Sequence, residues 1–210
     1  MMRVRIRFEK TEKMRFTSHL DLHRTWERTF RRARLPIAYT QGFSPHPKIN
    51  IASALPLGFT GENEIVDVWL ENPIEIDQIQ FALQKSLPPG IIVRDTQEID
   101  PHQPSLQSTL ESLEYIITLL KNEDNLTTRI EELVNTSQII RNWRGKEYNL
   151  RPLIHYIEMI PFDTLGRQRI LLRLAAKEGA TGRPEEVVSA LTINPLSVRI
   201  HRLRLLMLDT

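Results

Sequence analysis

Two histidines four residues apart are the first side chains that could do chemistry. His19 and His23 lie in the run SHLDLHRTWER, and Glu27 continues the row four residues later. On a helix this spacing places all three on one face, where two imidazoles can bind zinc. The run has no HExxH motif, and a third ligand would have to be Glu27 or His46. His19 and His23 are therefore weak metal candidates, and a hydrogen-bonded boundary histidine is the commoner interpretation of His19.

The loop GFSPHPK, residues 42–48, gathers an aromatic ring, an imidazole and an ammonium group. Gly42 permits a tight turn, and each proline holds the residue before it in an extended conformation. Phe43 can stack on a base, and Lys48 can contact a phosphate. The alternative is a rigid structural loop with Phe43 packed into the core.

A helix predicted over 19–34 leads into this loop, with Ser18 as its N-cap and Pro36 as its stop. Leu22, Trp26, Phe30 and Ala33 form its apolar stripe. The opposite side carries Arg24, Arg28, Arg31 and Arg32, which we call the arginine face. A solvated face usually mixes charges, but here Glu27 is the only acid between residues 22 and 61. Since arginine suits bidentate phosphate contacts and stacking on bases, the face favours a polyanion.

Basic and aromatic residues also alternate in RNWRGKEYNLRP, residues 141–152. This composition suits single-stranded nucleic acid. The candidate contacts in this run are Arg141, Trp143, Arg144, Lys146 and Arg151.

The formal net charge of +2 hides an uneven distribution. Residues 1–50 carry a balance of +8, residues 51–140 one of −11, and residues 141–210 one of +5. Basic ends around an acidic middle favour one surface for a polyanion. The alternative is that the three blocks neutralise one another in the fold.

The 210 residues include no cysteine. This excludes disulfides, thiol nucleophiles, cysteine zinc sites and cysteine-ligated iron–sulfur clusters in this chain. No apolar run approaches the roughly 20 residues of a membrane span, and the N-terminus MMRVRIRFEK lacks the apolar stretch of a signal peptide. We therefore expect a cytoplasmic protein with no membrane partner and no cofactor.

The order of predicted elements favours an α+β fold of two ferredoxin-like (βαββαβ) antiparallel sandwiches in tandem. The predicted domains are 1–100 and 112–210, joined by a polar linker over 101–111. In the first half the predicted strands are 4–8, 48–55, 64–70 and 91–93, with a return to strand at 14–16 and helices at 19–34 and 74–87. In the second half the strands are 113–120, 139–143, 169–175 and 198–207, the helices are 125–135 and 185–191, and 149–158 is a short helix followed by a strand.

Much of the first half, residues 15–70, also carries motifs of a known family. They are SHLD at 18–21, ER and RR at 27–28 and 31–32, LP at 35–36, GF at 42–43, PHPK at 45–48 and LPLG at 55–58, with LPPGI at 87–91 and NLRP at 149–152 beyond them. This pattern resembles the radical SAM-linked family of uncharacterised bacterial proteins. Its members are fused to, or encoded beside, a cobalamin-binding-type radical SAM protein.

The resemblance implies an accessory or substrate-presenting role beside a radical SAM partner encoded nearby. A radical SAM cluster needs three cysteines, so this chain is not expected to be the catalytic subunit. We predict that it binds a structured RNA, a tRNA or an rRNA, and presents it to that separate enzyme. The predicted RNA contacts are Arg24, Arg28, Arg31, Arg32, Phe43, His46, Lys48, Arg141, Trp143, Arg144, Lys146 and Arg151.

Two alternatives remain open at this point. The chain could be a protein adaptor whose basic surface docks an acidic patch on the partner, without RNA affinity of its own. It could also be a metal-independent RNA endonuclease, by fold-level analogy only. In that case His19 or His46 would act as a general base on a ribose 2′-hydroxyl.

Overall fold

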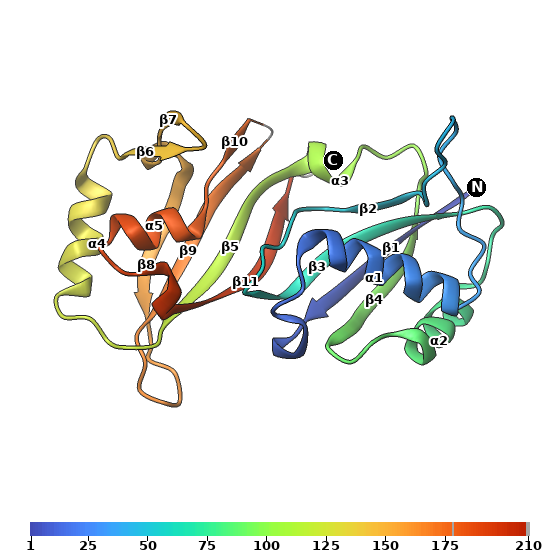
Figure 1. Cartoon of the computed structure of the whole chain (residues 1–210), viewed down its shortest axis with the longest axis horizontal. Coiled ribbons are helices and arrows are strands. Elements are labelled where there is room, and N and C mark those ends of the chain that lie inside the picture. Colours follow the sequence, from blue (N-terminus) through green and yellow to red (C-terminus); the bar gives the residue numbers. More distant parts are fainter. Residues whose placement is uncertain (178, 209–210) are drawn as a thin grey trace. The chain divides into compact units, whose positions relative to one another are not determined.

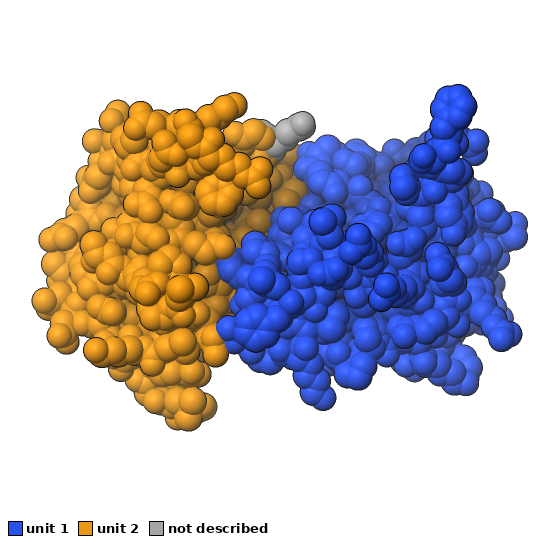
Figure 2. Space-filling view, viewed as in Figure 1, with its two compact units in different colours: residues 1–109 blue, residues 110–210 orange. Residues whose placement is uncertain are grey.

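The protein divides into two compact units, Met1–Thr109 and Leu110–Thr210, as the computed structural model shows (Figures 1 and 2). The structure describes residues 1–177 and 179–208. Each unit combines helices with an antiparallel sheet, so the predicted α+β class is confirmed. None of the helices in those described ranges is long and apolar enough to cross a membrane.

The chain segment that the sequence assigns to a linker is largely part of unit 1. Residues 101–109 lie within that unit, and Leu106 is fully buried there. Two carbonyl groups of this segment, those of Gln103 and Pro104, accept hydrogen bonds from Arg3. The segment is therefore held by side-chain contacts within unit 1.

Unit 1 is built around a four-stranded antiparallel sheet with the strand order β4-β1-β3-β2. Its elements are β1 (Met2–Lys10), the 3-10 turn Glu12–Met14, α1 (His19–Arg32), β2 (Ile49–Ile51), β3 (Phe59–Leu70), α2 (Ile76–Ser86), β4 (Ile91–Ile99) and α3 (Leu106–Thr109). Two of the helices, α1 and α2, contribute buried side chains to the same core as the strands.

Local sequence explains where α1 begins and which face it buries. The hydroxyl of Ser18 accepts a hydrogen bond from the backbone N–H of Asp21, as an N-cap should. Leu22, Trp26 and Phe30 recur every four residues and are all buried. The apolar stripe predicted from this spacing is therefore confirmed, and the arginines are left on the solvent side of the helix.

The predicted return to strand at 14–16 is wrong. The chain forms a 3-10 turn at Glu12–Met14 instead. The ammonium group of the fully buried Lys10 donates to the carbonyls of Thr17 at 2.9 Å and Phe59 at 3.0 Å. A buried ammonium group must be satisfied in this way, and these bonds hold the chain in a turn.

Three strand lengths also differ from the sequence prediction. The strand expected over 48–55 is confined to Ile49–Ile51, and the next strand begins at Phe59 rather than at Glu64. β4 continues to Ile99, because its polar second half pairs with β1 along the whole edge. Pairing between distant strands decided these bounds, and a local hydrophobic pattern does not report it.

The strands of unit 2 are antiparallel as well and have the order β8-β9-β5-β11, with a short β10 paired to β9. The elements are β5 (Leu110–Leu119), α4 (Leu126–Asn135), β6 (Ile140–Trp143), β7 (Lys146–Asn149), the 3-10 turn Arg151–Leu153, β8 (Ile154–Ile160), β9 (Arg169–Lys177), β10 (Ala180–Thr181), α5 (Pro184–Ala190), the 3-10 turn Pro195–Ser197 and β11 (Val198–Met207). A separate two-stranded hairpin is formed by β6 and β7. The short helix followed by a strand that the sequence predicts over 149–158 is confirmed by the turn Arg151–Leu153 and β8.

Glu114 on β5 ties three strands of unit 2 together. Its buried carboxylate accepts hydrogen bonds from Arg173 on β9 at 2.8 Å and from Arg204 on β11 at 2.7 Å. Burial by itself would raise the pKa of Glu114, but the hydrogen bonds from Arg204 and Arg173 outweigh burial and lower the pKa below its ordinary value. The carboxylate therefore stabilises the fold above the unfolded-state pKa of about 4.3. This stabilisation is lost as the pH falls through the folded-state pKa.

We expect Glu114→Gln to lower the free energy of unfolding at pH 7 by about 1.5–3 kcal/mol, because two charge-assisted hydrogen bonds are weakened. The difference from wild type should shrink at pH 3, which lies below the unfolded-state pKa, because part of the electrostatic stabilisation is lost there. Urea unfolding at both pH values measures this, with the exposed Glu131→Gln as control. A difference of equal size at pH 7 and pH 3 would contradict the electrostatic origin.

Candidate nucleic-acid interface

Helix α1 presents its arginines to solvent. The side chains of Arg24 and Arg31 are 66% and 72% exposed, and Arg28 between them is exposed too. The acids beside them make only loose ion pairs, Asp21 to Arg24 at 3.5 Å and Glu27 to Arg31 at 3.9 Å. Exposed pairs of this kind contribute about 0–1 kcal/mol, so the guanidinium groups of Arg24 and Arg31 can exchange these partners for a phosphate.

Arg32 differs from the other members of the arginine face. Its Nη2 donates to the carbonyl of Ser86 at the end of α2, at 2.7 Å. This side chain is exposed as well but joins the two helices of unit 1. The remaining solvent-facing row consists of Arg24, Arg28 and Arg31.

The loop after α1 forms a projecting stalk, which we define as residues 39–47 (Figures 1 and 2). The backbone N–H of Thr40 donates to the carbonyl of His46 at 2.9 Å, and the N–H of His46 returns a bond to the hydroxyl of Thr40 at 3.0 Å. Gly42 turns the tip with a φ of 131°, which an L side chain rarely adopts. Cross-bonds and prolines thus give this loop a defined shape.

Phe43 lies at the tip of the stalk and is fully exposed. The alternative in which Phe43 packs into the core is therefore wrong, because the stalk carries its ring away from the apolar side chains of unit 1. His46 is exposed as well. The structure thus leaves the ring free to meet another molecule.

Lys48 lies at the base of the stalk and has an aromatic neighbour that the sequence analysis did not predict. Its Nζ is 5.2 Å from the ring centroid of Trp69, and the guanidinium carbon of Arg3 is 4.8 Å from the same centroid. Lys48 is half-buried by this packing. Trp69 was missed in the sequence because only the pairing of β3 with its neighbours brings it to Lys48.

A hollow of about 370 Å³ lies between the end of α1 and the base of the stalk. Arg31 and Arg34 line it from the helix side, and Tyr39 and Pro47 line it from the stalk. Arg34 holds a left-handed backbone with a φ of 55°, which ends the helix before the stalk begins. The structure therefore brings one end of the arginine face and the stalk together at this hollow, with Arg34 and Tyr39 beside them.

The histidine candidates do not assemble into a metal centre. Among residues 1–177 and 179–208, no group of three or more histidine, aspartate or glutamate side chains could hold a metal ion. His19 and His23 both lie on α1 and are half-buried, whereas His46 is on the exposed stalk. Within that part of the chain, the structure therefore gives no third ligand to the pair His19 and His23.

In unit 2 the β6–β7 hairpin carries the basic and aromatic run. Arg144 and Gly145 form its turn, with φ values of 51° and 80°. Lys146 is exposed, and Trp143 is 39% exposed. The guanidinium carbon of Arg183 lies 3.9 Å from the ring centroid of Trp143, closer than that of Arg144 at 5.7 Å. Arg183 was missed because it lies forty positions further along the chain.

Two arginines of this run are bound within unit 2. Arg141 Nε donates to Glu186 at 2.7 Å. Arg151 donates to the carbonyl of Val134 at 3.1 and 2.9 Å, and to that of Ile154 at 3.2 Å. Arg151 thereby satisfies a carbonyl in the last turn of α4. These contacts give both arginines a structural role within unit 2, and their contact with RNA stays a prediction.

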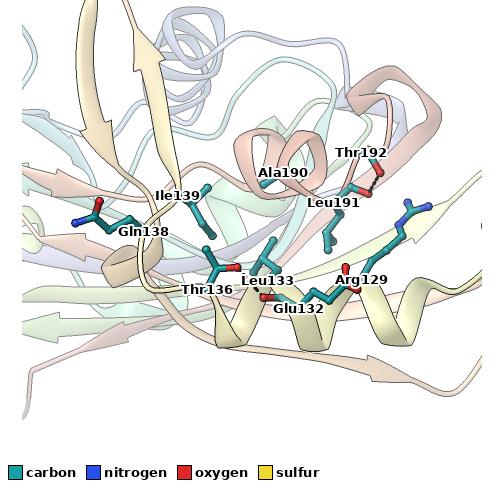
Figure 3. A pocket seen from close by; sticks show the side chains of 9 residues that line it. All are labelled: Arg129, Glu132, Leu133, Thr136, Gln138, Ile139, Ala190, Leu191 and Thr192. Atoms are coloured by element: carbon teal, nitrogen blue, oxygen red, sulfur yellow. Dashed lines mark hydrogen bonds between the residues drawn. The ribbon is translucent and has the colours of Figure 1, made fainter.

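A further hollow in unit 2, of about 410 Å³, lies between α4 and α5 (Figure 3). Leu133, Ile139 and Leu191 are among its lining side chains, and Arg129 lies at one end with its guanidinium group turned away from Ile139 (Figure 3). None of the residues predicted to bind RNA lines it. It is therefore separate from the basic surfaces described above.

The fold is similar to that of much larger solved chains. One chain in the crystal structure of a Cbf5-Nop10-Gar1 complex aligns over 96% of this chain and 48% of its own length, with 12% identity and a TM-score of 0.50. A chain in the structure of an H/ACA RNP bound to a substrate RNA containing 2′-deoxyuridine aligns over 96% and 47%, with 12% identity and a TM-score of 0.49. This chain thus spans about half the length of those chains. The first similarity shows a shared fold only, and the second is too distant to carry an argument.

Sequence comparison is more specific about the family than about the activity. Among proteins with curated descriptions, none matches this chain significantly. A family profile matches residues 3–184, a stretch that includes the arginine face, the stalk and the β6–β7 hairpin. The radical SAM linkage expected from the motifs stays a prediction. The chain belongs to the family DUF2344, described as uncharacterized protein conserved in bacteria.

Proposed function

We propose that the protein binds structured RNA, a tRNA or an rRNA, and presents it to a separate radical SAM enzyme. The observation that carries the RNA part is the pairing of a solvent-facing row, Arg24, Arg28 and Arg31, with a stalk that ends in the fully exposed Phe43. The partner enzyme rests on the family resemblance of the sequence motifs. The strand orders of the two units support the interpretation that each is a ferredoxin-like sandwich.

Each part of this surface suits a different part of RNA. Guanidinium groups neutralise phosphates and release the counterions condensed on them, which gives affinity without sequence preference. An exposed aromatic ring can stack on an unpaired base, at about 1–3 kcal/mol per base. Structured RNA offers both features, because its stems present phosphates and its loops present unstacked bases.

The test is a filter-binding titration of the full chain with a tRNA and with an rRNA fragment over a range of salt concentrations. We expect affinity at low salt, with log K falling linearly against log salt at a slope of about −0.7 to −0.9 for each phosphate neutralised. No affinity at low salt, or affinity indifferent to salt, would contradict the proposal.

The same basic surface also fits the acidic patch of a protein partner, so the adaptor alternative needs its own experiment. Co-purification of the radical SAM partner should be lost or weakened after nuclease treatment if RNA connects the two proteins. A complex that survives nuclease, together with no RNA affinity of this chain, would favour the adaptor.

A further inference from the structure

Unit 2 has a hollow of about 480 Å³ beside the β6–β7 hairpin, which we call the Trp143 hollow. Its lining includes Trp143, Lys146 and Tyr148 from the hairpin, and Thr181 and Arg183 from the segment before α5. Sites for small ligands usually occupy about 300–1,000 Å³. The hollow is therefore large enough for a ligand of nucleotide size.

The Trp143 hollow combines a flat stacking surface with positive charge. The guanidinium carbon of Arg183 lies 3.9 Å from the ring centroid of Trp143, so the guanidinium plane and the indole ring already pack against each other. No ion pair joins Arg183 or Lys146 to a carboxylate among residues 1–177 and 179–208. Glu186, three residues after Arg183, is instead bound by Arg141 at 2.7 Å. A guanidinium plane of this kind stacks on bases and pairs with phosphates.

Tyr148 supplies a hydroxyl that can recognise a ligand through a hydrogen bond. Its oxygen is buried and has no hydrogen-bond partner in the part of the chain that the structure describes. Burial raises the pKa of Tyr148 above its ordinary value, and the negative charge of Glu186 adds to the rise, whereas Arg183 opposes it. The hydroxyl therefore stays protonated at neutral pH and can donate a hydrogen bond. A buried polar group without a partner is costly, and a ligand group would remove this cost.

We propose that the Trp143 hollow binds a single unstacked nucleotide of single-stranded RNA. The base stacks against the Arg183–Trp143 pair, and Lys146 contacts a phosphate. The Tyr148 hydroxyl donates a hydrogen bond to the edge of the base. This deepens the proposed function, on which it rests, by assigning single-stranded RNA to unit 2 in addition to the structured RNA assigned to unit 1.

A first experiment tests the hollow with mononucleotides and the full chain. The indole N–H signals of Trp26, Trp69 and Trp143 are followed by NMR during titration with AMP, UMP and inorganic phosphate, and Trp143→Phe identifies one of them. We expect a saturable shift of the Trp143 signal with AMP or UMP, an unchanged signal of the buried Trp26, and little response to phosphate alone. No response of Trp143 to either nucleotide at millimolar concentration would overturn the proposal. A response of equal size to phosphate would overturn the base-stacking part and leave an anion site only.

A second experiment separates this proposal from the RNA binding of unit 1. We compare Arg183→Gln, Tyr148→Phe and the exposed control Lys121→Gln for affinity to a single-stranded hexanucleotide and to a tRNA. Arg183→Gln should weaken the hexanucleotide about tenfold, in line with one lost base contact, and the tRNA much less. Tyr148→Phe should weaken the hexanucleotide without lowering the stability of the protein.

The outcomes distinguish the two proposals. Unchanged hexanucleotide affinity of Arg183→Gln, while tRNA binding persists, would overturn the hollow and leave the proposed function standing. If the wild-type protein does not bind tRNA but its Trp143 signal still responds to AMP or UMP, the proposed function is overturned. The nucleotide site in unit 2 is then supported.

Discussion

Replacing Asp67 with asparagine is expected to lower the free energy of unfolding by about 3–5 kcal/mol, the usual cost of breaking a buried ion pair. Asp67 is fully buried on β3, and Arg3 on β1 is 1% exposed. The carboxylate accepts bonds from Arg3 Nη2 at 2.6 Å and from Arg5 Nε at 2.9 Å. Without it, the Arg3 guanidinium would remain buried with no opposite charge, which is the expensive state.

The same substitution should also loosen the end of unit 1. Arg3 donates to the carbonyls of Gln103 and Pro104 at 2.6 and 3.1 Å, so its position orders this segment. We expect faster amide hydrogen exchange at 102–109 in Asp67→Asn than in wild type, even where the rest of unit 1 is protected.

Urea unfolding of wild type, Asp67→Asn and the exposed control Asp95→Asn measures the stability effect. A double variant, Asp67→Asn with Arg3→Met, removes the orphaned charge and should recover part of the loss. A cost for Asp67→Asn no greater than that of Asp95→Asn would show that the buried pair contributes little. Failure of the double variant to recover any stability would point to packing rather than charge.

The second large effect is on RNA affinity. Replacing Arg24, Arg28 and Arg31 together by glutamine removes three solvent-facing cations from α1. If each neutralises one phosphate, the salt slope should fall by about 2–3 and the affinity at about 0.1 M salt by about 100-fold. Stability should change little, because the three side chains are exposed and their ion pairs are loose.

A matched triple variant controls for net charge. Lys85, Arg94 and Lys121 are exposed cations outside α1, and changing them to glutamine gives the same net charge as the first variant. Filter binding of both triple variants to the same tRNA decides between a local surface and overall charge. Equal losses in the two variants would mean that RNA responds to net charge, and the arginine face would lose its assignment.

Phe43→Ala separates base stacking from charge on the same surface. It should weaken tRNA binding with the salt slope unchanged, whereas the arginine variant should change the slope. This contrast follows from stacking releasing no counterions, and one set of titrations measures both.

The sequence alone determined those features that rest on neighbours along the chain. The start of α1 at Ser18 and its buried stripe of Leu22, Trp26 and Phe30 follow from capping chemistry and helical spacing. The exposure of the opposite arginines follows from the same spacing. The α+β class could also be read from the order of apolar patterns.

Only the tertiary structure decided features that join distant segments. The stacking of Arg183 on Trp143, the approach of Lys48 to Trp69 and the extension of β4 to Ile99 each depend on segments far apart in the sequence. Whether a charged side chain is bound within the fold or lies in solvent depends on such contacts as well. Arg151 holds the end of α4, whereas Arg28, equally basic in the sequence, lies in solvent. Local periodicity reports which face of an element is apolar, but which groups meet across the fold is set by long-range packing and strand register.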